Sequence, residues 1–326
     1  MKILLVRVSS LGDVVHNMPM VSDIQRHFPD AQIDWVVEEA YTGLVRLHPA
    51  VRRVIPIALR RWRKSLFSHD TREEMQAFRR SLRHDEYDVI FDTQGLFKTG
   101  AVMRMARLAP NGHRVGLANA TQGSGYEAIS RIFHTRSIPV GLHTHAVQRA
   151  RLVAAGALGY QVEGLPDFGL QESMVAAQPA WLPAMPYVVF FHGTAGSAKR
   201  WNEKDWIALG KHVGERGMQV VLPWGDAREF EAAKRIASGI PGALVLPRLP
   251  LMDAVLLAQR AALVVGVDSG LTHIAAAFER PTVEIYCASP RWKTEGNWSP
   301  SVVNLGDEGK PPRLDDVSRA VDRLLH

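Results

Sequence analysis

The sequence contains very little cysteine and no long apolar run. Cys287 is the single cysteine among 326 residues, which excludes an intramolecular disulfide and a zinc site built from cysteines. No uninterrupted apolar stretch approaches the ~20 residues that a membrane-spanning helix needs. Arg7 breaks the first apolar run, and Asp13 follows before any small-residue cleavage site, so we expect no signal peptide. These absences together predict a cytoplasmic protein.

Two nucleotide-binding signatures and a metal-binding pattern are also missing. The turn after the first apolar run carries only Gly12, whereas a dinucleotide-binding dehydrogenase needs G-x-G-x-x-G there. The loop at 192–206 lacks the G-K-[ST] order of a Walker loop. His143 and His145 come without a partnered carboxylate, so we predict no metal site. The sequence therefore disfavours a nicotinamide enzyme.

The composition is that of a globular protein with an excess of positive charge. The chain has 46% hydrophobic and 22% charged residues, and it exceeds the size at which single cores usually stop growing, so we expect two domains. A net charge of +6 favours anionic partners, such as nucleic acid, phosphorylated small molecules or an anionic membrane face. The basic residues concentrate in the first half of the chain. Charge alone does not choose among these partners.

Short apolar runs alternate with amphipathic segments in both halves of the sequence. Continuous apolar strands that alternate with helices indicate parallel strands buried on both faces, so we predict an α/β protein with two Rossmann-like, doubly wound sheets. The expected strands are 3–8, 33–37, 53–57, 88–92 and 113–117, then 187–191, 218–222, 243–246, 262–267 and 282–286, and the clearest helices are 14–28, 72–84 and 314–326.

A region rich in proline and glycine separates the two halves. The period breaks down around 159–186, which is typical of a connector. We therefore predict an N-terminal domain at 1–165, a linker at 166–186 and a C-terminal domain at 187–326 that ends in a helix. Ligands of open α/β sheets bind at the carboxyl ends of the strands, so two such sheets facing each other would make one central cleft.

Asp13 lies just after the first strand, in the segment SSLGDVVHNMP at 9–19. One interpretation is a helix cap, since aspartate is a preferred N-cap and suits the positive end of a helix. The other is a catalytic base that takes a proton from a sugar hydroxyl. Position alone leaves both open.

Three strand ends in the second half carry residues suited to a nucleotide. Thr194 and Lys199 follow the strand at 187–191, where small residues and one ammonium group would suit a phosphate, although a solvated turn explains them as well. Trp224 and Glu229 follow the next strand, where a ring would stack on adenine and a carboxylate would bind ribose, or the ring would simply pack. The third strand end carries a polar turn into a helix, which either binds a diphosphate or caps that helix: Asp268, Ser269, Gly270 and His273.

The basic run RRWRK follows the third expected strand. It offers Arg60, Arg61, Arg63 and Lys64 around Trp62. Such runs are usually solvated faces, and the alternative is a docking site for an acceptor with several phosphates or carboxylates.

Taken together and in this order, these motifs resemble the lipopolysaccharide heptosyltransferase family. The resemblance runs from Met1 to about Tyr286, and the combination is far more specific than any single motif. The segments that carry it are SSLGDVVHNMP (9–19), WVVEEAY (35–41), VIPIALRRWRK (54–64), DTQGLFKTG (92–100), the H-G-T-x6-W-x4-W pattern (192–206), LPWG (222–225) and VDSGLTH (267–273).

The resemblance implies a GT-B fold of two Rossmann-like domains, with ADP-heptose bound mainly by the C-terminal domain and the lipid acceptor by the N-terminal one. Asp13 matches the family's general base and Lys199 its diphosphate lysine. The other donor-binding positions are Thr194, Ala195, Trp224, Glu229, Leu249, Asp268, Ser269, Gly270 and His273. Ala195 stands where the family has a hydroxyl residue and Leu249 where it has methionine, so those two contacts go to backbone or are lost.

The resulting expectation is an inverting transfer of heptose from ADP-heptose to a Kdo residue of Kdo2-lipid A. Asp13 and Lys199 are the expected catalytic residues, and Arg60, Arg61, Arg63 and Lys64 the expected acceptor contacts. We expect no required cofactor, leave open the help of a divalent ion, and expect no nucleic acid partner. The enzyme would act peripherally at the cytoplasmic face of the anionic inner membrane of a Gram-negative bacterium. The alternatives are the second heptosyltransferase and, more distantly, a sugar-nucleotide epimerase.

Overall fold

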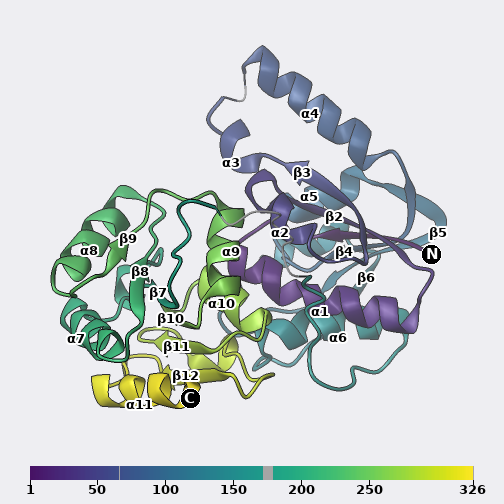
Figure 1. Ribbon diagram of the computed structural model, residues 1–326. Coiled ribbons are helices and arrows are strands. Elements are labelled where there is room, and N and C mark those ends of the chain that lie inside the picture. Colours follow the sequence, from purple (N-terminus) through teal and green to yellow (C-terminus); the bar gives the residue numbers. More distant parts are fainter. Residues whose placement is uncertain (66, 172–178, 326) are drawn as a thin grey trace. The chain divides into compact units, whose positions relative to one another are not determined.

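The protein is described by a computed structural model that covers residues 1–65, 67–171 and 179–325 (Figure 1). The chain divides into two compact units, Met1–Gln171 and Glu172–His326. In the expected linker, 166–171 and 179–186 contain no helix or strand, and 172–178 lies outside the described residues.

The first unit is built on a six-stranded parallel sheet with the order β3-β2-β1-β4-β5-β6. Its strands are β1 (Lys2–Val6), β2 (Gln32–Glu38), β3 (Val51–Ile57), β4 (Glu86–Asp92), β5 (Arg107–Leu117) and β6 (Arg136–Ile138). Its helices are α1 (Leu11–His27), α2 (Thr42–Val45), α3 (Leu59–Trp62), α4 (His69–Leu82), α5 (Phe97–Met105) and α6 (Ala146–Leu158), with the 3-10 turns η1 (Glu39–Tyr41) and η2 (Ala128–Phe133).

The second unit repeats this plan with the order β12-β11-β10-β7-β8-β9. Its strands are β7 (Tyr187–Phe191), β8 (Gln219–Leu222), β9 (Leu244–Val245), β10 (Leu263–Val267), β11 (Thr282–Tyr286) and β12 (Val302–Gly306). Its helices are α7 (Glu203–Gly214), α8 (Ala227–Ser238), α9 (Leu251–Arg260), α10 (Gly270–Ala277) and α11 (Leu314–Leu325), with the 3-10 turns η3 (Ser197–Lys199) and η4 (Arg291–Lys293).

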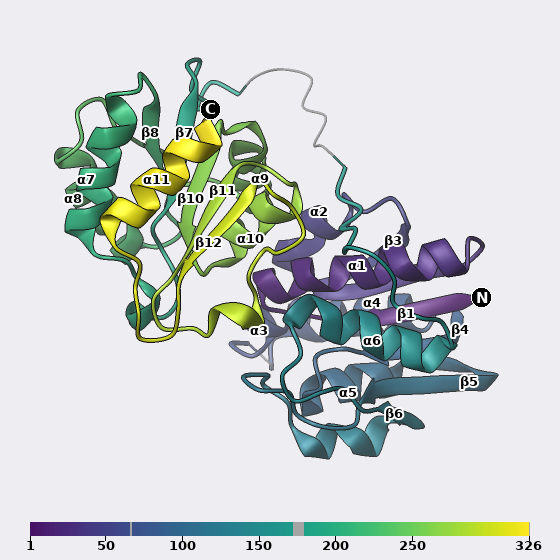
Figure 2. The ribbon, with the colours of Figure 1, turned by 90° about the horizontal axis from the view of Figure 1, so that it is seen from below.

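Helices cover both faces of each sheet, as the predicted doubly wound fold requires (Figure 2). In the first unit, α3, α4 and α5 bury Trp62, Phe78 and Met103 against one face, while α1 and α6 lie side by side on the other. A fully buried ion pair joins α1 to α6, with Arg151 Nε 2.6 Å from Asp23 Oδ2. In the second unit, α7, α8 and α11 pack on one face and α9 and α10 on the other.

Several predicted boundaries were wrong. The first strand ends at Val6 rather than at residue 8, and the next residue, Arg7, pairs its buried side chain with Asp13. The helix expected at 14–28 begins earlier, at Leu11. Two edge strands, β6 and β12, were not predicted, since each has only one fully buried residue and therefore no continuous apolar run.

Gly266 tests how tightly β10 packs against the helix that follows it. A Cβ atom at this position would collide with Thr272 Oγ1, which donates a 2.8 Å hydrogen bond to the Val267 carbonyl. We expect Gly266→Ala to lower the free energy of unfolding by about 1–3 kcal/mol, the usual effect of overpacking. Gly214→Ala is the control, because Gly214 ends α7 with open space around it and should gain a few tenths to about 1 kcal/mol. Urea unfolding measures both, and equal stability of the two variants would contradict this packing.

Candidate active site

Each sheet has one point at which the strand order reverses. It lies between β1 and β4 in the first unit and between β7 and β10 in the second. At such a point the loops beyond the carboxyl ends run in opposite directions and leave a crevice where ligands bind. Asp13, Lys199 and Asp268 follow β1, β7 and β10 respectively. The topology thus places these sequence-predicted residues at the carboxyl ends of their sheets.

Asp13 lies in the first turn of α1 and is held from two sides. Its Oδ2 accepts hydrogen bonds from the Ser10 amide at 3.0 Å and the Ser10 hydroxyl at 2.8 Å. Its Oδ1 lies 2.6 Å from a guanidinium nitrogen of Arg7. The first contact belongs to a capping box, in which Ser10 is the N-cap. The structure therefore makes Asp13 part of the helix cap and also sets its carboxylate at the sheet edge.

The surroundings of Asp13 keep its carboxyl group ionised. Burial raises its pKa, but the Arg7 charge and the hydrogen bonds from Ser10, with a smaller contribution from His16, outweigh burial and hold the pKa well below its usual range. Since about a third of the side chain remains exposed, the carboxylate is also reachable. The carboxylate is therefore in the unprotonated form that a general base requires.

Two buried arginines near Asp13 escaped the sequence prediction. Arg7 donates to the Thr93 carbonyl at 2.6 Å while it pairs with Asp13. Arg149 on α6 donates to Thr121 Oγ1 at 3.0 Å. Burial and the nearby Arg7 charge lower the pKa of Arg149, Asp13 raises it, and the net effect is a pKa of about 10. One signal for these residues was present in the sequence: Arg7 interrupts an apolar run and Arg149 lies within a largely apolar helix, where a buried charge usually needs a partner.

The RRWRK run begins within α3, with two residues between it and the end of β3, and its members differ in their surroundings. Arg60 lies over the Tyr41 ring at 5.6 Å. Arg61 is already paired with Glu39 and Glu74, at 3.0 and 2.8 Å. The Trp62 ring is buried against Phe78, so it is not an exposed aromatic platform. Arg63 and Lys64 are exposed.

In the second unit, a polar cluster gathers around Asp268. Lys199 Nζ lies 2.6 Å from Asp268 Oδ2, and the Ser289 hydroxyl donates to the same oxygen at 2.5 Å. The Thr194 hydroxyl donates to the Asp268 carbonyl at 3.2 Å. Burial raises the pKa of Asp268, but His273 and Lys199 lower it far below its usual range. The ionised carboxylate thus fixes the ammonium group of Lys199, whose side chain is 40% exposed.

His273 lies in the first turn of α10 and is fully buried. Its Nε2 lies 3.0 Å from Asp268 Oδ1, and its Nδ1 lies 3.0 Å from Glu284 Oε1. Burial lowers the pKa of His273, whereas Glu284 and Asp268 raise it, and the net effect is a pKa of about 10. Glu284 was missed by the sequence reasoning, since it lies inside the buried strand β11.

The amino end of α10 offers backbone donors. Ser269 is the N-cap by position, yet its hydroxyl bonds to Thr272 Oγ1 rather than to a first-turn amide. In the part of the chain that the structure describes, no side chain caps α10, and Gly270 opens the helix without a Cβ. First-turn amides with the positive helix end favour an anion.

The remaining predicted donor positions form a second group around β8. The Glu229 carboxylate accepts a hydrogen bond from the Gly225 amide at 2.7 Å. The Trp224 ring packs on Phe230 at 4.6 Å, and its indole N–H donates to the Leu246 carbonyl at 2.7 Å. Ala195 is exposed, and Leu249 packs partly on the core. Trp224 is therefore half-buried and held by its own unit.

The described residues offer no candidate for a metal site or a membrane-spanning helix. Among the described residues there is no group of three or more histidine, cysteine or acidic side chains that could hold a metal ion, and no helix long and apolar enough to cross a membrane. His145 caps α6 by accepting a hydrogen bond from the Val147 amide.

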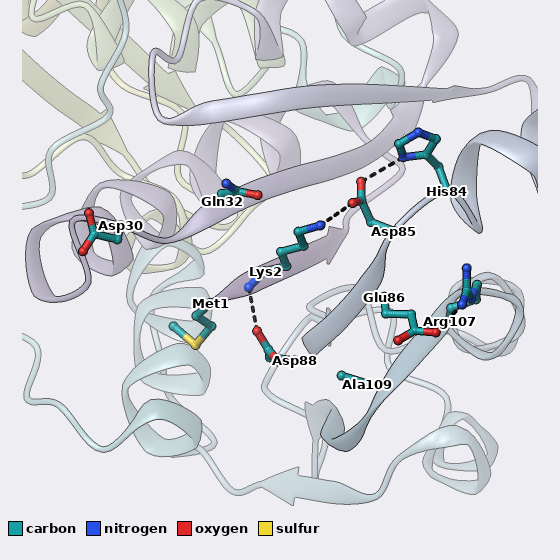
Figure 3. Close-up of a pocket in the computed structure, with 10 residues that line it drawn as sticks. All are labelled: Met1, Lys2, Asp30, Gln32, His84, Asp85, Glu86, Asp88, Arg107 and Ala109. Carbon is teal, nitrogen blue, oxygen red and sulfur yellow. Dashed lines mark hydrogen bonds and ion pairs between the residues drawn. The ribbon is translucent and has the colours of Figure 1, made fainter.

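Figure 3 shows an open pocket of about 590 Å³ at the amino ends of β1 and β4. Within it, the Lys2 ammonium group pairs with Asp85, and the Lys2 backbone amide donates to Asp88. This pocket lies at the amino ends of the strands, whereas Asp13 follows the carboxyl end of β1, so the pocket is not part of the candidate site.

Comparisons with known proteins agree with this geometry. A model of glycosyltransferase family 9 (heptosyltransferase) matches residues 75–321. Lipopolysaccharide heptosyltransferase 1 of Pseudomonas aeruginosa is 41% identical over 311 residues, covering 94% of this chain and 84% of that protein. The solved E. coli heptosyltransferase WaaC with ADP has a TM-score of 0.85 at 33% identity, with 99% of this chain and 100% of that chain covered. WaaC with ADP-2-deoxy-2-fluoro heptose gives a TM-score of 0.80 at 33% identity, with coverage of 100% and 99%.

These results confirm the predicted α/β class with two doubly wound parallel sheets, and they make the epimerase alternative wrong. The chain belongs to glycosyltransferase family 9, the heptosyltransferases, and is a glycosyltransferase.

Proposed function

We propose that this enzyme transfers heptose from ADP-heptose to a Kdo residue of Kdo2-lipid A, with inversion at the anomeric carbon. The observation that carries the proposal is the pairing of Lys199 with Asp268 at the point where the second sheet reverses its order, next to the uncapped end of α10. A fixed ammonium group and free backbone amides are the partners that a diphosphate needs. The similar WaaC structures contain ADP and an ADP-heptose analogue.

The proposed reaction is a single displacement at the anomeric carbon. The acceptor hydroxyl oxygen forms a bond to the anomeric carbon of heptose and loses its proton to Asp13. The bond between that carbon and the phosphate oxygen breaks, and its electrons leave with ADP. Lys199 and the first amides of α10 offset the charge that grows on the departing diphosphate. The proposed reaction requires no resident cofactor.

The proposed donor contacts extend from Lys199 to β8. Thr194, which already bonds to the Asp268 carbonyl, lies beside the diphosphate site. Glu229 accepts from the Gly225 amide through one carboxylate oxygen, and we assign its other oxygen to the ribose hydroxyls. The Trp224 ring, fixed by its bond to Leu246, supplies a flat surface for adenine.

The identity of the acceptor distinguishes the proposed function from that of the second heptosyltransferase, which adds heptose to the first heptose. Purified protein with ADP-heptose is given either Kdo2-lipid A or the same lipid already carrying one heptose. We expect transfer to the first acceptor. Transfer to the heptosylated acceptor alone would identify the second enzyme.

We propose that the RRWRK run binds the anionic groups of the acceptor and holds the enzyme at an anionic inner-membrane surface. Replacing Arg60, Arg61, Arg63 and Lys64 with Gln should raise the acceptor KM and weaken binding to anionic vesicles. Each basic residue near such a surface contributes about 1 kcal/mol, screened within roughly 8–10 Å in ordinary salt. Arg61, paired with two glutamates, should contribute least. ADP-heptose affinity, which depends on the second unit, should stay nearly unchanged.

The matched control removes positive charge elsewhere in the same unit. Replacing Arg72, Arg79 and Arg80 of α4, and Arg83 just after it, with Gln takes away four charges that no predicted contact uses. If the acceptor KM rises equally in both variants, RRWRK acts only through net charge. If neither KM nor vesicle binding changes, the run is a solvated face.

A further inference from the structure

A row of alternating charges runs from the surface of the second unit into its core. Lys199 contacts Asp268, Asp268 contacts His273, and His273 contacts Glu284, with separations of 2.6, 3.0 and 3.0 Å. Lys199 is partly exposed, whereas His273 and Glu284 are 4% and 0% exposed. The row therefore connects the proposed diphosphate lysine to a carboxylate that no solvent reaches.

Both ring nitrogens of His273 face carboxylate oxygens. Carboxylates only accept hydrogen bonds, so two such contacts require a proton on each nitrogen and make the ring an imidazolium. The charged and titratable groups around the ring are Asp268 at the end of β10, Lys199 beyond it, and Glu284 and Tyr286 on β11. Burial raises the pKa of Tyr286 well above its usual value, so that hydroxyl stays neutral. Two negative groups thus face one buried ring.

Two hydrogen bonds hold the Glu284 carboxylate on the side away from His273. Its Oε2 accepts hydrogen bonds from the Tyr286 hydroxyl at 2.8 Å and the Gly296 amide at 3.0 Å, which leaves Oε1 directed at His273. A buried carboxylate with this many donors is expensive to desolvate and adds little to stability on its own. The geometry of Glu284 is better explained by its contact with His273, which requires a proton on Nδ1 of the ring.

We propose that Glu284 is a positioning residue for the transfer reaction, since it keeps His273 doubly protonated and thereby fixes the Asp268 carboxylate that orients the Lys199 ammonium group. The proposal rests on the proposed function of Lys199 at the diphosphate. Glu284 itself touches no substrate, and neither ring nitrogen of His273 is free to bind the donor. In this proposal His273, predicted from the sequence as a donor contact, holds the Asp268 carboxylate in place instead.

Glu284→Gln tests this role because it keeps the size of the side chain and removes its charge. With only Asp268 left beside it, the buried ring should lose its proton in the neutral range. The ratio of wild-type to variant kcat should then grow by about tenfold between roughly pH 6 and 9, which corresponds to losing about one charge-assisted contact. Tyr286→Phe is the matched control, because it removes a neighbour of Glu284 but keeps the charge. Its kcat ratio to wild type should not vary with pH.

A second measurement depends neither on activity nor on the Glu284→Gln variant. Nitrogen NMR of the full wild-type chain, with His273 assigned from the spectrum of His273→Gln, should show both ring nitrogens protonated up to about pH 9. A ring that titrates near its ordinary value in the wild-type protein would overturn the proposal, as would a kcat ratio for Glu284→Gln that is flat with pH. If wild-type protein transfers no heptose at all, the proposed function fails, while the NMR titration still decides the state of His273.

Discussion

Asp13→Asn should lower kcat with Kdo2-lipid A by about 10²–10⁴, the range typical for loss of a general base. The amide keeps the shape of the side chain and can still accept from Ser10, but it cannot take the acceptor proton. It also leaves Arg7 without its charged partner, so the thermal stability of the variant must be measured alongside its rate. Steady-state kinetics with saturating ADP-heptose measures the effect.

Ser10→Ala is the control for the helix-cap explanation of Asp13. It removes the hydroxyl of the N-cap residue and the hydrogen bond to Asp13 Oδ2, while the carboxylate and its contact with Arg7 remain. Loss of a cap costs about 0.5–2 kcal/mol of stability, so this variant should be less stable but keep most of its activity. If Asp13→Asn retains near wild-type kcat, Asp13 is a cap and not the base.

Lys199→Met should produce the second large loss, about 10²–10³ in kcat, comparable to removing one preorganised group that stabilises developing charge. The ammonium group lies at the proposed diphosphate position, and methionine has similar length without the charge. Affinity for ADP should fall as well, because the product carries the same diphosphate. Transfer kinetics and calorimetry with ADP measure the two effects.

Lys204→Met is the matched control for charge. Lys204 lies in the first turn of α7, exposed and five positions beyond Lys199, so it changes the net charge of the unit equally. We expect its kcat and ADP affinity to match those of the wild-type protein. Equal losses in the two variants would assign the effect to the overall field rather than to a contact at Lys199.

The strands that the sequence located best are those with both faces buried. β7 and β11 were predicted at their observed bounds, because all five residues of each are buried. The edge strands β6 and β12 have half-exposed residues, which leave no apolar run to recognise. Burial of both faces is a local property of the sequence, whereas pairing at a sheet edge depends on the neighbouring strand.

The candidate site was predictable as far as it lies in the segments that follow strands. Asp13, Lys199 and Asp268 stand where a strand pattern stops, so position alone made them candidates. Arg7 and Glu284 lie within or directly after apolar runs, and their partners are distant in sequence or on another element. Residue type and spacing do not reveal such pairs, because the contacts arise only when the sheets form.

The anomeric configuration of the product tests the central claim most directly. Purified protein is incubated with ADP-heptose and Kdo2-lipid A, and the glycolipid is analysed by NMR while ADP release is followed. A single displacement assisted by Asp13 predicts one heptose on Kdo for each ADP released, with the configuration opposite to that of the donor. A product with the donor's configuration, or ADP release without a new bond to Kdo, would contradict the account.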